Sequence, residues 1–394
     1  MKILFLNIWA DLPFGTRHLN HREHEIWHVC DPKNGLRYVR MCLADDEVSG
    51  ITVPSSEDPR ELLMLLQSVY AQFPFERVVA LDEHTVLPAA YIREVFNIPG
   101  PRPAEVEAFR DKRRMKQILG PKGVRVIRDI EPGTITPENF RSCVIKKVDG
   151  TASGGVYLCH SYEEYAAHVD DVAEGALLEE FVEGEVYHVD GAYGPNGFVA
   201  VPHLYLNNCH MLYIDRKPVG SVGVDDPVLR QRMIEFTHDV IRGLPSEEGV
   251  FHMELIRTPD DELVFLEIAG RVGGGEVQHN FGDAYGFDLV DFHVASQLGL
   301  SPEVGKVREG VIAGWIMMNH WEHQDGIYTG LRLDPLSEDN CLHGIWQPRL
   351  GRPLIPGSTQ VVKFWLRGES TEAVSRSILE LFEKAHPGSV PRPQ

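Results

Sequence analysis

Short apolar runs alternate with amphipathic stretches in the first hundred residues. Residues 2–7 and 77–81 are compact apolar runs typical of buried strands, and residues 61–70 carry apolar side chains at helical spacing. A second helix is expected over residues 86–96, ahead of the helix-breaking segment at residues 98–101. Strands that alternate with helices predict a parallel α/β sheet. Since ligands bind at the carboxyl ends of such strands, the loops 11–15 and 82–84, the latter with Glu83, are candidate site loops.

Four histidines follow at steps of three and four residues: His18, His21, His24 and His28. On a helix these side chains would share one side. A metal cluster is one interpretation. The polar face of a surface helix is the favoured one, because no carboxylate or cysteine spacing completes a known site type.

Residues 251–268 predict a β-hairpin, because two alternating apolar segments flank the turn residues 258–261. A turn centred between Asp260 and Asp261 places Glu254 directly opposite Glu267. Paired side chains on one face have Cβ atoms about 5 Å apart, so the two carboxylates repel each other unless a cation lies between them. Oxygen ligands favour Mg²⁺ or Mn²⁺. A solvent-facing hairpin with two ordinary acids is the alternative at this point.

Two earlier segments have the chemistry of a nucleotide site. Residues 143–159 are predicted to form a strand with lysines at its end, a glycine-rich loop and a second strand. Backbone N–H groups of such a loop, together with Lys146 or Lys147, can bind phosphate oxygens. A flexible hairpin turn is the alternative, and the P-loop motif is absent. In residues 177–190 several glutamates flank the apolar pair Phe181-Val182, an arrangement that suits an adenine base and its ribose hydroxyls.

The remaining pattern predicts a basic amphipathic helix over residues 109–120, strands within residues 186–215, and helices over residues 230–244 and 283–298. Residues 306–394 have short strands, many turns and a closing helix at about residues 371–384. We expect this part to close or dimerise the protein. The final residues, 386–394, are expected to be mobile.

Composition excludes several partners. The 394 residues include 58 acids and 38 bases, a net charge of −20, which argues against nucleic acid or an anionic membrane as partner. No apolar run approaches the roughly 18 residues that span a bilayer, and the N-terminus is interpreted as a first strand and not a signal peptide. The six cysteines form no C-x-x-C pair, as expected for reduced thiols in a cytoplasmic protein.

Four blocks in this order resemble the ATP-grasp superfamily of carboxylate–amine ligases, over about residues 1–305. They are FRDKRRMKQIL, VIKKVDGTASGGV, LLEEFVEGEVYHVD and FHMELIRTPDDELVFLEIAGRVGGG. The H-x-E hairpin and the A-x-R-x-G-G-G loop are most similar to the L-amino acid ligases, which form dipeptides. The resemblance implies an ATP-grasp fold (α/β plus α+β) with three parts: a Rossmann-like domain at 1–108, the ATP-grasp domain at 109–305 with a lid at about 120–182, and a C-terminal α+β portion at 306–394 that completes the module.

The resemblance also implies roles for individual residues. Arg271 and Lys146 would be catalytic, with Arg271 on the substrate carboxylate, although a structural salt bridge from Arg271 to Glu267 is the alternative. Glu254 and Glu267 would bind Mg²⁺ or Mn²⁺. The residues expected to bind ATP are Lys112, Lys146, Ser153, Gly154, Gly155, Glu179, Glu180, Phe181, Val182 and Glu185. Those expected to bind substrate are Glu83, His203, His252, Arg271, Gly273 and Gly274.

Two positions depart from the family pattern. Lys147 stands where proline is frequent, so either Lys146 or Lys147 faces the phosphates. Ala269 stands where an asparagine metal ligand is usual. In the predicted register His252 lies opposite Ala269, and our hypothesis is that His252, or a water it holds, fills this place. His252→Ala should then alter metal dependence or rate.

The implied function is ATP-dependent amide or peptide bond formation through an acyl phosphate, with ADP and phosphate as products and amino acids as substrates. One alternative is a ligase that acts on a non-amino-acid carboxylate or a larger peptide. Another is a nucleotide-binding protein without ligase activity. A homodimer is expected from the resemblance, with small-molecule substrates and no nucleic acid or membrane partner.

Overall fold

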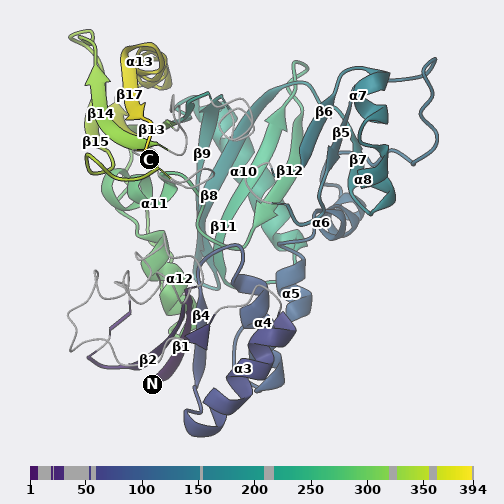
Figure 1. The fold of residues 1–394 in the computed structure, drawn as a ribbon, viewed down its shortest axis with the longest axis vertical. Coiled ribbons are helices and arrows are strands. Elements are labelled where there is room, and N and C mark those ends of the chain that lie inside the picture. The colour runs from purple at the N-terminus through teal and green to yellow at the C-terminus, as the bar shows by residue number, and fades with distance from the viewer. Residues whose placement is uncertain are drawn as a thin grey trace.

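The computed structural model describes residues 1–7, 19–20, 22–30, 53–54, 59–150, 154–207, 217–318, 326–354 and 362–392. The predicted loop 11–15, His18, His21 and Ser153 lie outside these residues. Four sheets organise the described chain, and Figure 1 shows them from the N-terminal sheet at the bottom to the C-terminal strands at the upper left.

The N-terminal sheet is parallel, with strand order β3-β2-β1-β4, which confirms the α/β prediction. Along β1, Leu4 and Leu6 pack into one core with α3 and α4, while Ile3 and Phe5 face a second core that includes α12. Both faces of this strand are therefore covered, as a run of consecutive apolar residues requires. The elements here are β1 (Lys2–Asn7), β2 (Glu25–Cys30), β3 (Val53–Pro54), α3 (Pro59–Gln72), β4 (Arg77–Ala80), α4 (Val86–Val95) and α5 (Pro103–Glu107).

The helix expected for the histidine segment is wrong where the structure describes it. Glu25–Cys30 is strand β2, paired in parallel with β1. His28 is buried on this strand and packs edge-on against Phe5. Ile26 and Val29 have helical spacing, but on β2 they lie on opposite faces of the sheet and pack into different cores.

A small three-stranded antiparallel sheet, β6-β5-β7, stands apart at the upper right of Figure 1. Its core is built on Cys143, Ile145 and Cys159. Helix α6 leads into it and begins at Lys112, because the Asp111 side chain accepts a hydrogen bond from the backbone N–H of Arg114 (2.9 Å). The elements are α6 (Lys112–Leu119), a 3-10 turn (Gly120–Lys122), β5 (Cys143–Lys146), β6 (Val156–Cys159), α7 (Tyr162–Ala166), α8 (Val169–Ala173) and β7 (Leu177–Glu180).

The central sheet has eight strands in the order β12-β11-β8-β9-β10-β13-β16-β15. Alternation gives its two faces different chemistry. Odd-numbered residues of β8 and β11, such as Val189 and Met253, pack in one core with α10. Even-numbered residues face the other way, and these include His188, Asp190 and Glu254.

The elements of this sheet and its helices are β8 (Glu185–Gly194), β9 (Gly197–Leu206), β10 (Val219–Gly223), α10 (Pro227–Gly243), β11 (Gly249–Arg257), β12 (Leu263–Ala269), α11 (Val277–His279), a π-helical turn (Asn280–Ala284), α12 (Leu289–Gln297), β13 (Ile312–Met318), β15 (Leu342–Trp346), β16 (Val362–Gly368) and α13 (Thr371–Lys384). The predicted helix at 283–298 begins later, at Leu289, because the Asp288 side chain caps it by accepting a hydrogen bond from the backbone N–H of Val290 (2.9 Å).

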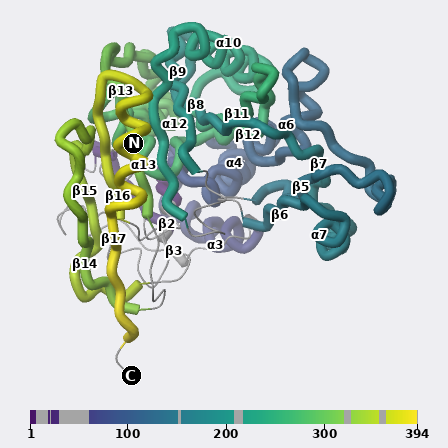
Figure 2. Tube along the Cα trace, turned by 90° about the horizontal axis from the view of Figure 1, so that it is seen from above, coloured from purple at the N-terminus to yellow at the C-terminus, as the bar shows by residue number. Residues whose placement is uncertain are grey.

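The C-terminal residues continue this architecture. Strands β13, β16 and β15 extend the central sheet from β10, and α13 covers them through Val374, Ile378 and Leu381. The expectation of a mobile tail is wrong for the described part, since β17 (Ala385–Val390) pairs antiparallel with β14 (Ile327–Leu333). Figure 2 shows β14 and β17 side by side, on the opposite side of the molecule from the β5–β7 sheet. Among the described helices, none is long and apolar enough to cross a membrane.

Candidate active site

The β11–β12 hairpin brings Glu254 and Glu267 together as predicted. The two residues are paired across the strands, and His252 is paired with Ala269. Lys112 Nζ lies 2.9 Å from Glu267 Oε2, and the Tyr205 hydroxyl donates to Glu254 Oε1 (3.2 Å). Burial alone would raise the pKa of Glu254, but the hydrogen bond and charge of His252 lower it. The pair is therefore a carboxylate site with a lysine already beside it.

A cavity of about 350 Å³ separates this hairpin from the three-stranded sheet, which is a volume typical of small-molecule sites. Glu254 and Glu267 form one wall. The opposite wall comes from β5, β6, β7 and the connection after β7. Its residues are Val144, Lys146, Lys147, Gly150, Gly154, Val156, Leu158, Glu179, Glu180, Phe181, Val182, Glu183 and Gly184.

Buried lysines meet one buried carboxylate in this cavity. Glu179 is 1% exposed, and its two oxygens bind Lys146 Nζ (2.8 Å) and Lys116 Nζ (2.7 Å). Lys112 Nζ also donates to the backbone oxygen of Gly150 (2.8 Å), so it joins the glycine loop to Glu267. Lys112 and Lys146 thus line the cavity where a polyphosphate would need positive charge, and Lys116 holds Glu179 from outside the lining.

The other predicted nucleotide residues differ in position. Glu180 lines the cavity, but it pairs with Arg125 and Arg128, which offset the pKa increase from burial and leave the pKa of Glu180 lowered. Phe181 is 37% exposed at the cavity edge. Glu185 is exposed and binds the Tyr187 hydroxyl (2.8 Å), outside the cavity lining, whereas Glu183 lies within it.

Arg271 ends the hairpin and pairs with Glu83, not with Glu267. Glu83 also binds Arg110 (2.6 Å), so one carboxylate from the end of β4 is held between two guanidinium groups. Burial favours a higher pKa for Glu83, but the charges of Arg271 and Arg110 outweigh it and lower that pKa. The contact joins the N-terminal sheet to the hairpin.

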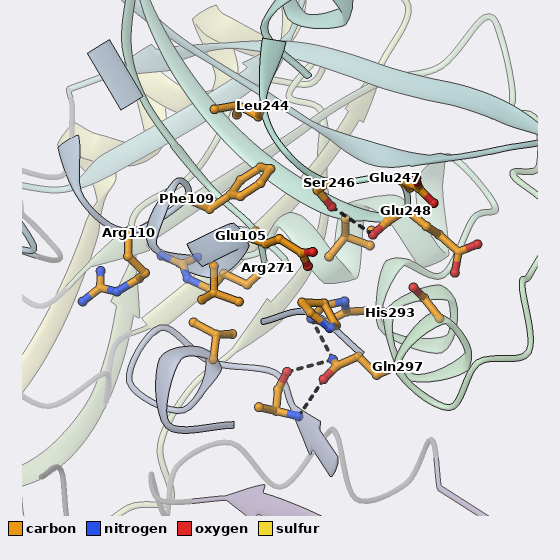
Figure 3. Close-up of a pocket in the computed structure, with 18 of the residues that line it drawn as sticks. Glu105, Phe109, Arg110, Leu244, Ser246, Glu247, Glu248, Arg271, His293 and Gln297 are labelled. Atoms are coloured by element: carbon orange, nitrogen blue, oxygen red, sulfur yellow. Dashed lines mark hydrogen bonds between the residues drawn. The ribbon is translucent and has the colours of Figure 1, made fainter. Parts of the chain in front are cut away.

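A second cavity of about 610 Å³ opens beside Arg271, between α4, α5, α12 and the connection that precedes β11 (Figure 3). Its walls carry charges of both signs, with Glu105, Glu247 and Glu248 opposite the arginines. His293 Nδ1, buried in the lining, has no hydrogen-bond partner in the described part of the chain. A polar molecule with both positive and negative groups suits such a lining.

His203 lies in neither cavity lining. It is 2% exposed, with Nδ1 3.0 Å from the Ser221 hydroxyl and Nε2 2.7 Å from the Tyr285 hydroxyl. Gly273 lies close to Asp190 and His252, because a Cβ there would stand 2.4 Å from Asp190 Oδ1 and 2.7 Å from His252 Nδ1. Gly274 has open space around it. The glycine loop therefore covers the polar side chains of the sheet.

Comparisons with known proteins identify this arrangement. Residues 109–275 match the family model described as the ATP-grasp domain. A Bacillus subtilis L-arginine-specific L-amino acid ligase is 23% identical over 312 residues, which cover 72% of this chain and 73% of that protein. Residues 109–275 form an ATP-grasp domain. The chain is an enzyme of the ATP-grasp ligase type.

Solved structures show the same ATP-grasp fold. The L-amino acid ligase from Bacillus licheniformis aligns with 100% of this chain and 99% of its own, with a TM-score of 0.77 at 17% identity. The biotin carboxylase domain of Hydrogenobacter thermophilus 2-oxoglutarate carboxylase, solved as a dimer with MgADP, ADP and bicarbonate, has a TM-score of 0.68 at 15% identity and covers 99% and 91% of the two chains.

Several residues of this ATP-grasp site were not predicted. Lys116 lies one helical turn after Lys112, and that i, i+4 spacing on a basic helix is a signal for a shared face. His188 and Asp190 repeat on β8 the alternation of His252 and Glu254 on β11. The sequence therefore contained both signals, although neither shows which face is buried.

The Lys116–Glu179–Lys146 cluster leads to a stability prediction. Glu179→Gln removes the carboxylate that pairs with Lys146, whereas Lys116 keeps its second partner, Asp129, so we expect the free energy of unfolding to fall by about 3 kcal/mol. Urea unfolding followed by circular dichroism measures it. Glu183→Gln is the matched control, because Glu183 lines the same cavity but is exposed. Equal effects of the two substitutions would contradict the prediction.

Proposed function

We propose that this ATP-grasp enzyme joins two amino acids with ATP, through an acyl phosphate, and releases ADP and phosphate. The observation that carries the proposal is the pairing of Glu254 and Glu267 on the wall of a lysine-lined cavity, next to Arg271. The Bacillus subtilis relative is named an L-amino acid ligase, which supports amino acids as the substrate class.

The chemistry explains why such a site is needed. A carboxylate does not condense with an amine at neutral pH, because hydroxide or oxide is a poor leaving group. In the proposed reaction, a carboxylate oxygen of the first amino acid attacks the γ-phosphorus of ATP and ADP leaves. The amine nitrogen of the second amino acid then attacks the acyl carbon, phosphate leaves, and the amine loses its proton. Phosphate therefore forms only as the amide bond forms.

The nucleotide would occupy the cavity between the hairpin and the β5–β7 sheet. Lys112 and Lys146 would bind the phosphates, with Lys116 holding Glu179 in place behind them. Gly154 and Gly155 would cover the terminal phosphate, and Lys147, whose aliphatic chain packs under Gly155, would support that loop. The backbone at Phe181 and Val182 would contact the base. Glu183, which lines the cavity, would bind the ribose in place of the exposed Glu185.

The carboxylate pair fits a hard divalent cation. Two oxygen donors face each other across the hairpin, and Lys112 already neutralises one of them. Bound Mg²⁺ or Mn²⁺ would offset charge on the transferred phosphoryl group. Glu254 and Glu267 would hold the ion. His252, which faces Glu254 across 3.6 Å, would stand in for the ligand that Ala269 lacks.

The larger cavity beside Arg271 is the proposed place for the amino acids. Arg271 would bind the reacting carboxylate and then the tetrahedral oxyanion, with backbone N–H groups of Gly273 and Gly274 nearby. Glu83 would position Arg271. The acids Glu105, Glu247 and Glu248 favour an ammonium or a basic side chain, in line with the arginine specificity in the name of the Bacillus subtilis relative.

The test is phosphate release that depends on an added amine. Pairs of the twenty amino acids, beginning with arginine and lysine, are incubated with ATP and Mg²⁺. Products are identified by mass spectrometry, and ADP is separated from AMP. We expect ADP, phosphate and a dipeptide in equal amounts. AMP and pyrophosphate would contradict the acyl-phosphate route, and no turnover with any pair would contradict amino acids as the substrates.

Two further proposals follow from the family resemblance. The first is the division into domains at residues 108 and 305. The second is a homodimer, which light scattering of the purified protein would test.

A further inference from the structure

Two neighbouring strands bring three metal-binding side chains together on the inner face of the central sheet. His188 and Asp190 are two residues apart on β8, so both point to the same side. On β11, His252 is paired with Asp190, and Glu254 is paired with His188. The register therefore fixes a group of two imidazoles and one carboxylate directly beside the Glu254–Glu267 pair.

The donor atoms of this group converge. His188 Nδ1 lies 2.5 Å from Asp190 Oδ2, and His252 Nδ1 lies 2.8 Å from Asp190 Oδ1. One ligand atom from each of the three side chains lies within 4.8 Å of the other two. His188 and Asp190 are each 1% exposed, and the His252 side chain is 11% exposed. Water therefore competes little for these donors.

The outer nitrogen of each histidine also has a partner. His188 Nε2 is 2.7 Å from the Ser221 hydroxyl, which in turn contacts His203 Nδ1. His252 Nε2 faces Glu254 Oε1 at 3.6 Å. Histidines that bind metals through one ring nitrogen almost always engage the other with a carboxylate, carbonyl, water or similar group, which fixes the ring. The His188 ring is held in this way, the His252 ring has the longer contact with Glu254, and both rings turn Nδ1 toward Asp190.

We propose that His188, Asp190 and His252 form a site for a divalent transition-metal ion of the zinc class, next to the magnesium pair, with His252 offering Nδ1 to this site and turning Nε2 toward Glu254 of the pair. Two imidazoles and one carboxylate suit zinc or cobalt better than magnesium, which prefers oxygen donors. Ligand atoms on a tetrahedral ion are about 3.3 Å apart when the bonds are about 2.0 Å long. The two imidazoles contact different oxygens of Asp190, at 2.5 and 2.8 Å, and each contact would lengthen by about 0.5–0.8 Å around such an ion.

Gly273 lies against two of the three proposed ligands. Its backbone lies against Asp190 and His252 so closely that a Cβ would collide with both. The glycine loop that carries Arg271 thus covers the metal group. A bound ion would hold β8 and β11 together beneath this loop. The proposal concerns metal binding alone and does not depend on the ligase reaction.

Metal binding is measured directly on the full chain. The protein is stripped with a chelator, supplied with excess Mg²⁺ to occupy the carboxylate pair, given Zn²⁺ or Co²⁺, and gel-filtered. We expect one equivalent of zinc to remain. We also expect Co²⁺ to produce the visible absorption of a tetrahedral site.

Three variants assign the binding to these residues. His188→Gln and His252→Gln are each expected to reduce the retained metal from one equivalent to none and to remove the cobalt absorption. His203→Gln is the matched control, because it is a buried histidine of the same hydrogen-bonded network but not one of the three proposed ligands. It should keep the metal, as should Glu267→Gln.

The same measurements can overturn the proposal. Wild-type protein that retains no zinc and shows no cobalt absorption would mean that Asp190 is simply satisfied by its two histidines. Equal loss in His203→Gln and His188→Gln would mean that the network matters only for folding. Circular dichroism checks that each variant is folded. If His188→Gln is unfolded, the metal retained by His252→Gln and the zinc stoichiometry of the wild-type protein decide whether the site exists.

Discussion

Glu267→Gln is expected to abolish turnover while leaving the fold intact. Glutamine keeps the size of the side chain but removes the charge that pairs with Lys112 and with the proposed metal ion. The Glu267 side chain is 35% exposed, so the loss should change the free energy of unfolding little. Phosphate release measures activity, and thermal unfolding by circular dichroism measures the fold.

Asp260→Asn is the matched control for this variant. It removes one carboxylate from the turn of the same hairpin, at an exposed position outside both cavities. We expect wild-type activity from it. Substantial turnover by Glu267→Gln would show that the hairpin does not hold the metal.

Arg271→Lys is expected to lower kcat about a hundredfold or more, which corresponds to roughly 3 kcal/mol of transition-state stabilisation. Lysine keeps the charge but lacks the planar fork that binds a carboxylate or an oxyanion through two N–H groups. Steady-state kinetics with the best amino acid pair separates kcat from KM.

Arg110→Lys separates a direct role from an indirect one. Arg110 and Arg271 bind the same carboxylate, that of Glu83. If Arg271 contacts substrate, Arg110→Lys should cost far less activity than Arg271→Lys. Equal losses would mean that both arginines act only by holding Glu83.

The β11–β12 hairpin shows what sequence can and cannot predict. The pairs Glu254–Glu267 and His252–Ala269 are as expected, but the turn is not. The turn is centred on Asp260, not between Asp260 and Asp261, so Arg257 is paired with Leu263. Asp261 has a left-handed backbone conformation (φ 63°). A bulge next to Glu254 adds one residue to β12 and restores the predicted register. Two errors therefore cancel, because turn composition specifies neither turn length nor a bulge.

Elements with strong periodicity or caps were predictable, and polar edges were not. The closing helix Thr371–Lys384 has the predicted bounds, since Ser370 caps its N-terminus. Strand β15 has mostly exposed residues and was missed, as was the pairing of β17, because an edge strand with Pro387 and Gly388 has no apolar alternation. The buried positions of His203 and of Glu179 depend on contacts between distant segments, which one sequence does not reveal.

The continuous ladder of the central sheet limits how the chain can be divided. The family match ends at residue 275, yet Gly275 packs against Trp315 of β13. β13 also pairs along β10, whose five residues are all buried. A chain that stops before residue 311 would leave the backbone of β10 unpaired on the side where β13 lies, and such open strand edges promote aggregation. We therefore expect residues 109–275 to require the later strands for soluble folding, although those strands line neither cavity.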